Sequence, residues 1–125
     1  MKKIALFAAI IGAVAWWRFR PFRVEIAGDS MEPALNDGDS CIAVIARPGE
    51  VRKGDVVVLE HPERPGFELV KRVHGAGDGE IYVVGDNVEA SNDSRDFGPV
   101  RVSAVKGRVV GIYRPRLERL VRSQA

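Results

Sequence analysis

Apolar and polar residues follow two different patterns along this 125-residue chain. Near the N-terminus there is one uncharged apolar run, Ile4–Trp17, with lysines before it and arginines after it. From residue 21 onwards, short apolar runs alternate with turns rich in Gly, Pro and Asp, a pattern typical of β-strands. The pattern predicts an N-terminal membrane anchor over residues 1–20, a β-rich domain over residues 21–115 and a basic tail over residues 116–125.

The β-rich part contains six predicted strands. Phe22–Ile26 alternates apolar and polar residues, as a strand buried on one face does, whereas Ser40–Ala46 is nearly all apolar. The Gly-rich segment Gly75–Gly79 is expected to form the longer loop of a hairpin, and Gly85–Gly98 a polar loop. We therefore expect a mainly β fold, a compact and mostly antiparallel domain. The predicted strands are 22–26, 40–46, 55–60, 67–74, 81–84 and 105–113.

The N-terminal run is short for a membrane span. As a helix, Ile4–Trp17 is about 21 Å long, whereas the hydrocarbon core is about 30 Å thick. A helix over residues 2–19 reaches about 27 Å, with its flanking cations extended towards the headgroups and two tryptophans at the interface. An uncleaved single-pass anchor is therefore the favoured interpretation, and membrane lipid is a predicted partner.

Two other interpretations of this run stay open. Ala13-Val14-Ala15 has the small-x-small form of a leader-peptidase site, so the run could be a cleaved signal peptide. It could also be a buried core helix. Lys2 and Lys3 are balanced by arginines after the run, so the charge count does not set the orientation.

Composition narrows the function classes. The chain has 19 basic and 17 acidic residues, a balance that argues against nucleic acid as a partner. Cys41 is the only cysteine, which excludes an intrachain disulfide, and its apolar neighbours predict that it is buried. His61 and His74 lack the clustered ligands of a zinc site. No metal or cofactor is expected, and the sequence predicts no oligomeric state.

Two Asp-Ser pairs, ending at Ser30 and Ser40, raise the question of a serine nucleophile. Such a serine needs a base, and no histidine is usefully placed. Lys71 interrupts an apolar strand; if it points inwards, lowering its pKa from about 10.4 to 7–8 requires about 4 kcal/mol in favour of the neutral amine. The alternative is a lysine on the solvent face, paired with an acid.

Four segments, taken together, resemble one family, the type I signal peptidases. Gly28–Leu35 (GDSMEPAL) resembles their nucleophile box. Lys53–Val58 (KGDVVV) resembles their strand with the pattern Arg/Lys-Gly-Asp-Ile/Val-Val-Val. Leu69–Gly75 (LVKRVHG) is similar to the box that carries the general base, and 82–100 to the last box, with its Gly-Asp-Asn and Ser-x-Asp-Ser-Arg. The boxes occur in the family's order over residues 22–113.

This resemblance implies a membrane-bound serine endopeptidase with a Ser-Lys dyad and a signal-peptidase/LexA-like antiparallel β domain. Ser30 would be the nucleophile, Lys71 the general base and Ser91 the hydroxyl that orients the lysine amine. Asp93 and Arg95 would brace the active-site loop as a buried pair, and Arg72 matches a structural position. Gly28 and Met31 belong to the nucleophile box and are expected to support it.

Three departures from the family pattern stand out. Some relatives carry a serine where this chain has Gly28, and its hydroxyl assists the oxyanion hole; the backbone amide of Ser30 must then do more of that work. Ala34 replaces the usual threonine of the nucleophile box. Only a short Gly-rich turn follows the lysine box, so the chain resembles a near-minimal catalytic core.

The resemblance further implies a substrate and a location. The partner would be a precursor polypeptide with small residues near the cleavage site, from which an N-terminal signal or leader peptide is removed. The catalytic domain is expected on the extracytoplasmic side of a membrane.

Three rival functions remain. A short family member could instead process one dedicated precursor, as the maturation protease of nickel superoxide dismutase does. LexA- and phage-repressor-type autoproteases share the dyad, but they would carry a DNA-binding helical domain and a self-cleavage site. A non-catalytic β module at a membrane would not need Ser30, Lys71 and Ser91 together.

Overall fold

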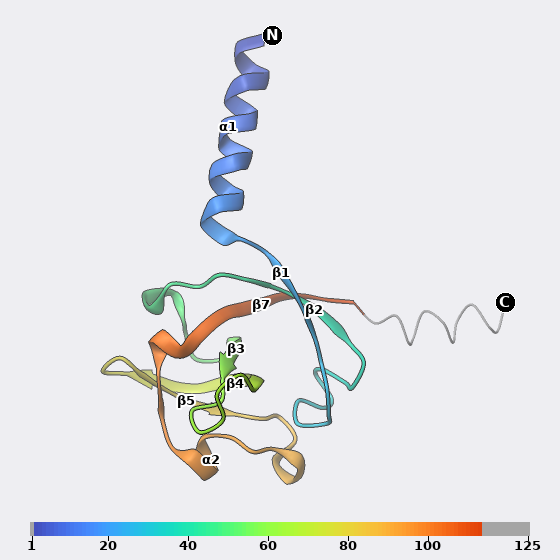
Figure 1. Ribbon diagram of the computed structural model, residues 1–125, viewed down its shortest axis with the longest axis vertical. Helices are drawn as coiled ribbons and strands as arrows, with labels where there is room; N and C mark the ends of the chain where they lie inside the picture. Colours follow the sequence, from blue (N-terminus) through green and yellow to red (C-terminus); the bar gives the residue numbers. More distant parts are fainter. Residues whose placement is uncertain (1, 114–125) are drawn as a thin grey trace, which may run out of the picture.

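The computed structural model describes residues 2–113. Its seven strands form one antiparallel sheet in the order β1-β2-β7-β3-β4-β5-β6, which confirms the predicted mainly β fold. Figure 1 shows helix α1 (Lys2–Phe19) projecting away from this β domain. The strands are β1 (Phe22–Glu25), β2 (Ser40–Val44), β3 (Val56–Glu60), β4 (Glu68–Gly77), β5 (Glu80–Val84), β6 (Val100–Arg101) and β7 (Val105–Tyr113).

The six predicted strands are all present: 105–113 matches β7 at both ends, and the ends of the others differ by at most three residues. The expected longer hairpin loop is wrong: β4 continues to Gly77 and β5 starts at Glu80, leaving Asp78-Gly79 as the turn. Both turn residues have positive φ, 54° and 76°, which suits a tight two-residue hairpin. The strand β6 and four short helical turns were not predicted: η1 (Pro48–Glu50), η2 (Val88–Ala90), α2 (Ser94–Phe97) and η3 (Val102–Ala104).

The strand β3 separates two groups of core residues. Val57 and Leu59 pack in one group with residues of β4, β5 and β6, whereas Val58 packs in the other with residues of β1 and β2. Successive residues of a strand point to opposite faces, so this central strand is buried on both sides. Cys41 has no exposed surface and belongs to the second group, as predicted.

The sheet curls so that distant strands approach each other. β1 is separated from β4 by three strands in the sheet order, yet residues of both line the same pocket. This curl places the segment after β1 close to the start of β4. The position of the candidate site follows from it.

The helix α1 contains no buried residue, so the interpretation as a buried core helix is wrong. Arg18, near its end, forms an ion pair with Glu50, and the amide of Ile45 donates to the carbonyl of Phe19 at 2.6 Å. Within residues 2–113, no helix combines the length and hydropathy that a membrane span requires, so the predicted transmembrane helix is not confirmed. The predicted basic tail, residues 116–125, lies outside the described residues.

Candidate active site

The loop between β1 and β2 carries Ser30. Its two ends are held together because the amide of Ile26 donates to Asp39 O at 2.8 Å and the amide of Gly38 donates to Ile26 O at 2.9 Å. Inside the loop, Met31 and Leu35 are four residues apart and both are buried in the core beside Val58. The residue after Ser30 is therefore fixed in the core, while Ser30 itself is half-buried and lines a pocket.

Gly28 shapes the start of this loop. Its φ of +90° lies in the left-handed region, where glycine is favoured over residues with a Cβ. Its amide donates to Asp37 Oδ1 at 2.8 Å, and the residue lines the same pocket as Ser30. The backbone at Gly28 thus has a conformation that favours glycine, at the position where some relatives carry a serine hydroxyl.

Lys71 lies in β4 directly opposite Val57, on the strand face that also carries Leu69 and Val73. Only 3% of its surface is exposed. Burial lowers the pKa of its amine from the ordinary 10.5; attraction to the carboxylates of Asp93 and Asp96 opposes this effect, and repulsion by Arg95 adds to it. Burial therefore shifts the amine towards its neutral form, the form that can accept a proton.

Ser91 is hydrogen-bonded to the lysine amine. Lys71 Nζ donates to Ser91 Oγ at 3.0 Å, and that hydroxyl donates to Asp93 Oδ2 at 2.6 Å. A hydroxyl has one proton to donate, so its donation to Asp93 leaves its lone pairs for the lysine. The three side chains form a directed chain of hydrogen bonds.

Asp93 remains anionic although it has no exposed surface. Burial favours its protonated form, but hydrogen bonds from Arg95, from Ser91 and from the amides of Gly85 and Arg95 outweigh burial and hold its pKa well below the usual range. The amide of Gly85 donates at 2.8 Å and Arg95 Nε at 2.9 Å. The predicted buried pair is wrong in one member, because Asp93 is buried whereas Arg95 is exposed.

The segment Gly85–Asn87 packs directly against the loop that carries Ser30. The amide of Asn87 donates to Ser30 O at 2.9 Å, and its side chain donates to Asp29 O at 3.1 Å. A Cβ at Gly85 would lie 2.2 Å from Ser91 Oγ and 2.6 Å from Ser30 O. Glycine is required here by the close approach of the two segments, which brings Ser91 and Ser30 to the same small region.

Arg72, next to Lys71 in β4, ties the strand to this segment. Its guanidinium donates two hydrogen bonds to the Asp86 carboxylate, at 2.8 and 2.9 Å, and a third to Gly54 O at 2.9 Å. The hydrogen bond to Asp86 raises the pKa of Arg72. The strand that holds Lys71 and the segment that supports Ser30 are thus linked by a bidentate ion pair.

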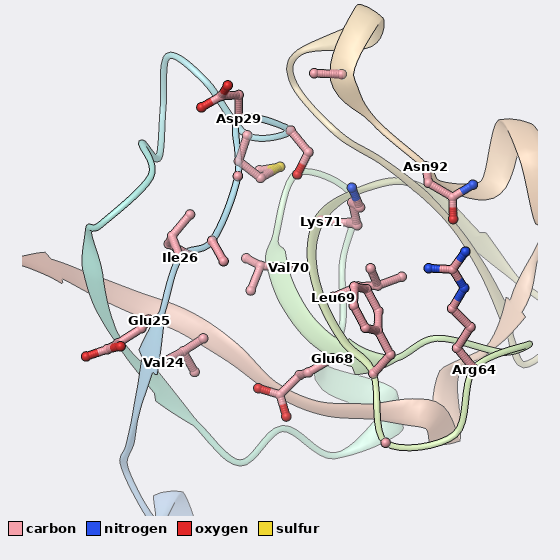
Figure 2. Close-up of a pocket in the computed structure, with 17 residues that line it drawn as sticks. Val24, Glu25, Ile26, Asp29, Arg64, Glu68, Leu69, Val70, Lys71 and Asn92 are labelled. Atoms are coloured by element: carbon pink, nitrogen blue, oxygen red, sulfur yellow. The ribbon is translucent and has the colours of Figure 1, made fainter.

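Ser30 and Lys71 line one pocket of about 530 Å³. One wall is residues 24–31 and the other includes residues 66–71, as Figure 2 shows for Val24, Ile26, Val70 and Lys71. β1 pairs only with β2, and β5 pairs with β4 only from Arg72 onwards, so both walls present strand edges without a partner among residues 2–113. An extended peptide between them could hydrogen-bond to backbone on either side.

The structure brings together all the residues predicted for the site. Gly28, Ser30, Met31 and Lys71 line the pocket; Ser91, Asp93 and Arg95 form the hydrogen-bonded cluster behind the lysine amine. Within residues 2–113 no hydrogen bond joins Ser30 to Lys71, and the catalytic roles stay predictions. Ser40, the other serine considered, begins β2 as expected and accepts a hydrogen bond from Arg23 at 3.0 Å.

The contacts that support the site were not predicted from the sequence. Asn87 and Asp86 belong to a recognised box, yet nothing local showed that they reach Ser30 and Arg72. His61 carried no signal beyond its residue type, and Asn92 is only an unspecified position of the last box; the two are hydrogen-bonded to each other at 2.8 Å, and Asn92 lines the pocket. Such contacts depend on how the loops fold over the sheet.

Comparisons with known proteins place the chain in a family. The family model described as signal peptidase, peptidase S26, matches residues 1–78 and 76–114. Mitochondrial inner membrane protease subunit 1 of Xenopus tropicalis is 30% identical over 105 residues, covering 66% of this chain and 63% of the relative. Mitochondrial ATP-independent inner membrane protease subunit 1a of Arabidopsis thaliana is 34% identical over 110 residues, covering 68% and 66%.

A third relative, mitochondrial inner membrane protease subunit 2 of Danio rerio, is 32% identical over 114 residues, covering 72% of this chain and 62% of its own length. The chain thus spans slightly less than two thirds of the length of these relatives. The family match extends over nearly the whole described chain. The chain belongs to the signal peptidase family, peptidase S26.

Proposed function

We propose that this chain is a serine endopeptidase that removes N-terminal signal or leader segments from precursor polypeptides. Ser30 is the nucleophile and Lys71 the general base. The observation that carries the proposal is the buried amine of Lys71, held by Ser91 at the wall of a pocket that Ser30 also lines. Membership of the signal peptidase family and the names of the protease relatives support it.

The reaction proceeds in two halves. In the first, the neutral Lys71 amine takes the hydroxyl proton of Ser30 as its oxygen attacks the scissile carbonyl carbon. The C–N bond then breaks, the lysine ammonium gives its proton to the leaving amine, and an ester to Ser30 remains. In the second half, Lys71 takes a proton from water and the resulting hydroxide attacks the ester carbon. The C–O bond to Ser30 then breaks, the carboxyl product leaves, and the lysine ammonium returns the proton to the oxygen of Ser30.

Ser91 and Asp93 act on the base rather than on the substrate. The hydroxyl of Ser91 aims the lysine amine, as a third group orients the base of a triad. The anionic Asp93 favours the lysine ammonium that forms during the attack, because opposite charges attract strongly where water is excluded. The backbone amide of Ser30 is the proposed donor to the oxyanion.

The pocket accommodates the substrate as an extended strand between β1 and the start of β4. Its backbone pairs with the two unpaired strand edges, and its side chains alternate between the core and solvent. Ile26, Met31 and Val70 form an apolar wall on the core side. The proposal expects small side chains near the cleavage site, next to this apolar wall.

We further propose that α1 inserts into a membrane and holds the pocket close to it. Every described residue from Lys2 to Trp17 is exposed, most of them are apolar, and cations flank the run. The relatives named inner membrane proteases support membrane association. The full chain should sediment with membranes and resist extraction by carbonate; release into the carbonate supernatant would contradict the proposal.

The catalytic proposal is tested with two substitutions in the full chain. Ser30→Ala and Lys71→Ala should each lower cleavage of a precursor peptide at least about 1,000-fold, because each removes a reacting group. Ser91→Ala should lower it less, since Ser91 does not react. Cleavage is measured by mass spectrometry, and N-terminal sequencing of precursors that accumulate with Ser30→Ala identifies the substrate.

Ser40→Ala is the matched control, because Ser40 follows an aspartate as Ser30 does but lies outside the pocket. Its activity should equal that of the unmodified chain. Retained cleavage in Ser30→Ala or Lys71→Ala would exclude the dyad.

A further inference from the structure

His61 is a buried polar residue that the proposed chemistry does not use. It directly follows β3, and only 6% of its surface is exposed. Its ring lies near two aromatic rings, with centroid distances of 6.1 Å to Phe67 and 5.1 Å to Phe97. Buried polar side chains are normally hydrogen-bonded, and both ring nitrogens of His61 have partners.

The hydrogen bonds define a single neutral tautomer. The amide of Glu63 donates to His61 Nδ1 at 3.0 Å, so Nδ1 carries no proton. The proton of the neutral ring is therefore on Nε2, which donates to Asn92 Oδ1 at 2.8 Å. His61 thus acts as an acceptor towards one segment and as a donor towards another.

The acceptor side holds the connection between β3 and β4. This connection also contains backbone hydrogen bonds from His61 N to Phe67 O at 2.7 Å and from Phe67 N to Arg64 O at 3.0 Å. Arg64, Gly66 and Phe67 line the pocket. The acceptor nitrogen of His61 therefore stabilises one wall of the proposed substrate site.

The donor side holds the segment that orients the general base. Asn92 lies between Ser91, which accepts from Lys71, and Asp93, which accepts from Ser91. Its amide nitrogen lies 3.4 Å from Asp96 Oδ2, an atom that also accepts from the amide of Asp93 at 3.2 Å. Figure 2 shows Asn92 and Arg64 on the same side of the pocket. A shift of Asn92 would move the hydroxyl that aims the amine.

We propose that His61 is a positioning residue that links the pocket wall at residues 64–67 to the general base Lys71. Its Nδ1 fixes the position of the wall through Glu63, and its Nε2 fixes the position of Asn92 and, through it, that of Ser91. The proposal rests on the proposed peptidase function. It predicts that the two ring nitrogens affect different kinetic parameters. Loss of the Nδ1 contact raises KM, whereas loss of the Nε2 contact lowers kcat.

Two substitutions separate the nitrogens. Asn places an amide oxygen near the position of Nδ1 but cannot reach Asn92, whereas Gln places an amide nitrogen near the position of Nε2 without an acceptor for Glu63. His61→Asn should keep KM and lower kcat about tenfold, the effect on the alignment of the base of losing one partly buried hydrogen bond. His61→Gln should keep kcat and raise KM about tenfold, because the pocket wall loses the hydrogen bond from the amide of Glu63 to Nδ1.

The exposed His74, which faces Tyr82 at 6.1 Å, is the matched control. His74→Asn and His74→Gln should change neither parameter by more than about twofold, as expected of surface positions. Thermal unfolding of all four variants shows whether each is folded at the assay temperature. The proposal would be overturned if kcat and KM changed together in both His61 variants. It would also be overturned if the loss of activity in each variant equalled the loss of folded protein.

A second readout does not depend on peptidase activity. In nuclear magnetic resonance spectra of the full chain in detergent, the side-chain amide of Asn92 should shift in His61→Asn and stay in place in His61→Gln. The backbone amide of Glu63 should do the reverse. If the unmodified chain cleaves no precursor, the peptidase proposal fails while these spectra still decide the hydrogen bonds; shifts of both signals in both variants would refute the assignment.

Discussion

At the scale of single residues, the most consequential position is Lys71. Its neighbours on the strand face are Leu69 and Val73, with Val57 opposite, so its ammonium form has little access to water. A leucine or valine would fit this face without that cost. Burying a lysine here costs the free energy of desolvating its ammonium form. Such perturbed groups are concentrated at functional sites, which links the burial of Lys71 to its proposed role.

The lowered pKa of Lys71 predicts two pH dependences. Peptidase activity should rise with pH as the amine loses its proton, with a midpoint below the ordinary value of 10.5. Stability should rise over the same range: between the folded pKa and the unfolded value of about 10.4, the unfolded chain binds more protons. Lys71→Met removes this effect, so its stability advantage over the unmodified chain is largest below the folded pKa.

The measurement is denaturant unfolding of both chains at a series of pH values. The difference in free energy of unfolding should fall by about 1.4 kcal/mol for each unit by which the pKa is lowered, and become constant above about pH 10.4. Asp93 keeps Arg95 as its partner in both chains, so it does not dominate the comparison. A difference that stays constant from pH 6 to 11, or an activity profile without a rise, would show that Lys71 is not desolvated.

At the scale of elements, the site depends on two loops that meet. The loop after β1 carries Ser30, the segment after β5 carries Gly85–Asn87, and a backbone hydrogen bond of 2.9 Å joins them. Neither loop reaches Lys71 through its own sequence. Arg72, in the middle of β4, holds the second loop through its ion pair with Asp86, so β4 positions both the proposed base and the support of the proposed nucleophile.

Gly85→Ala should disrupt this contact between elements. The added methyl would lie closer than 3 Å to Ser91 Oγ and to Ser30 O, so at least one of them must move. A displacement of about 1 Å in a catalytic arrangement costs about 100-fold in rate, and we expect a loss of that size in kcat/KM.

Gly77→Ala is the control, because nothing lies within 4 Å of a Cβ at that position and its backbone is not left-handed. It should leave kcat/KM within about twofold, as for a surface substitution. If Gly85→Ala keeps full activity while the chain remains folded, the two loops do not set the geometry of the site.

At the scale of the whole molecule, the curled sheet and the helix are nearly separate. The sheet brings β1 and β4 together to form the pocket, and α1 projects away from it (Figure 1). The described contacts that hold the end of α1 are the Arg18–Glu50 ion pair and the hydrogen bond from Ile45 to Phe19. The core groups contain no residue of α1.

Removal of residues 1–20 should therefore leave a folded and active domain. We expect kcat/KM for a short soluble precursor peptide within about threefold of the full chain, since a partly exposed ion pair contributes at most about 1 kcal/mol. The shortened chain should no longer sediment with membranes. Thermal unfolding and peptide cleavage measure the outcome, and loss of the folded state would show that α1 stabilises the β domain.

The sequence by itself determined what depends on near neighbours in the chain. The alternation of apolar and polar residues predicted the strands, and the boxes around Ser30, Lys71 and Ser91 predicted the candidate site. Two-residue β6 and four-residue α2 are too short for a periodic pattern, so they could not be predicted. The Asp78-Gly79 turn was missed because its glycine-rich neighbours obscured where β4 ends.

Only the tertiary structure decided which segments meet. The strand order and the curl that brings β1 to β4 depend on contacts between residues far apart in the chain. The hydrogen bonds of Asn87 to Ser30 and of His61 to Asn92 exist because loops pack over that curled sheet. Local patterns report which face of a strand is apolar, whereas the packing of these faces in three dimensions sets the neighbours of each reactive group.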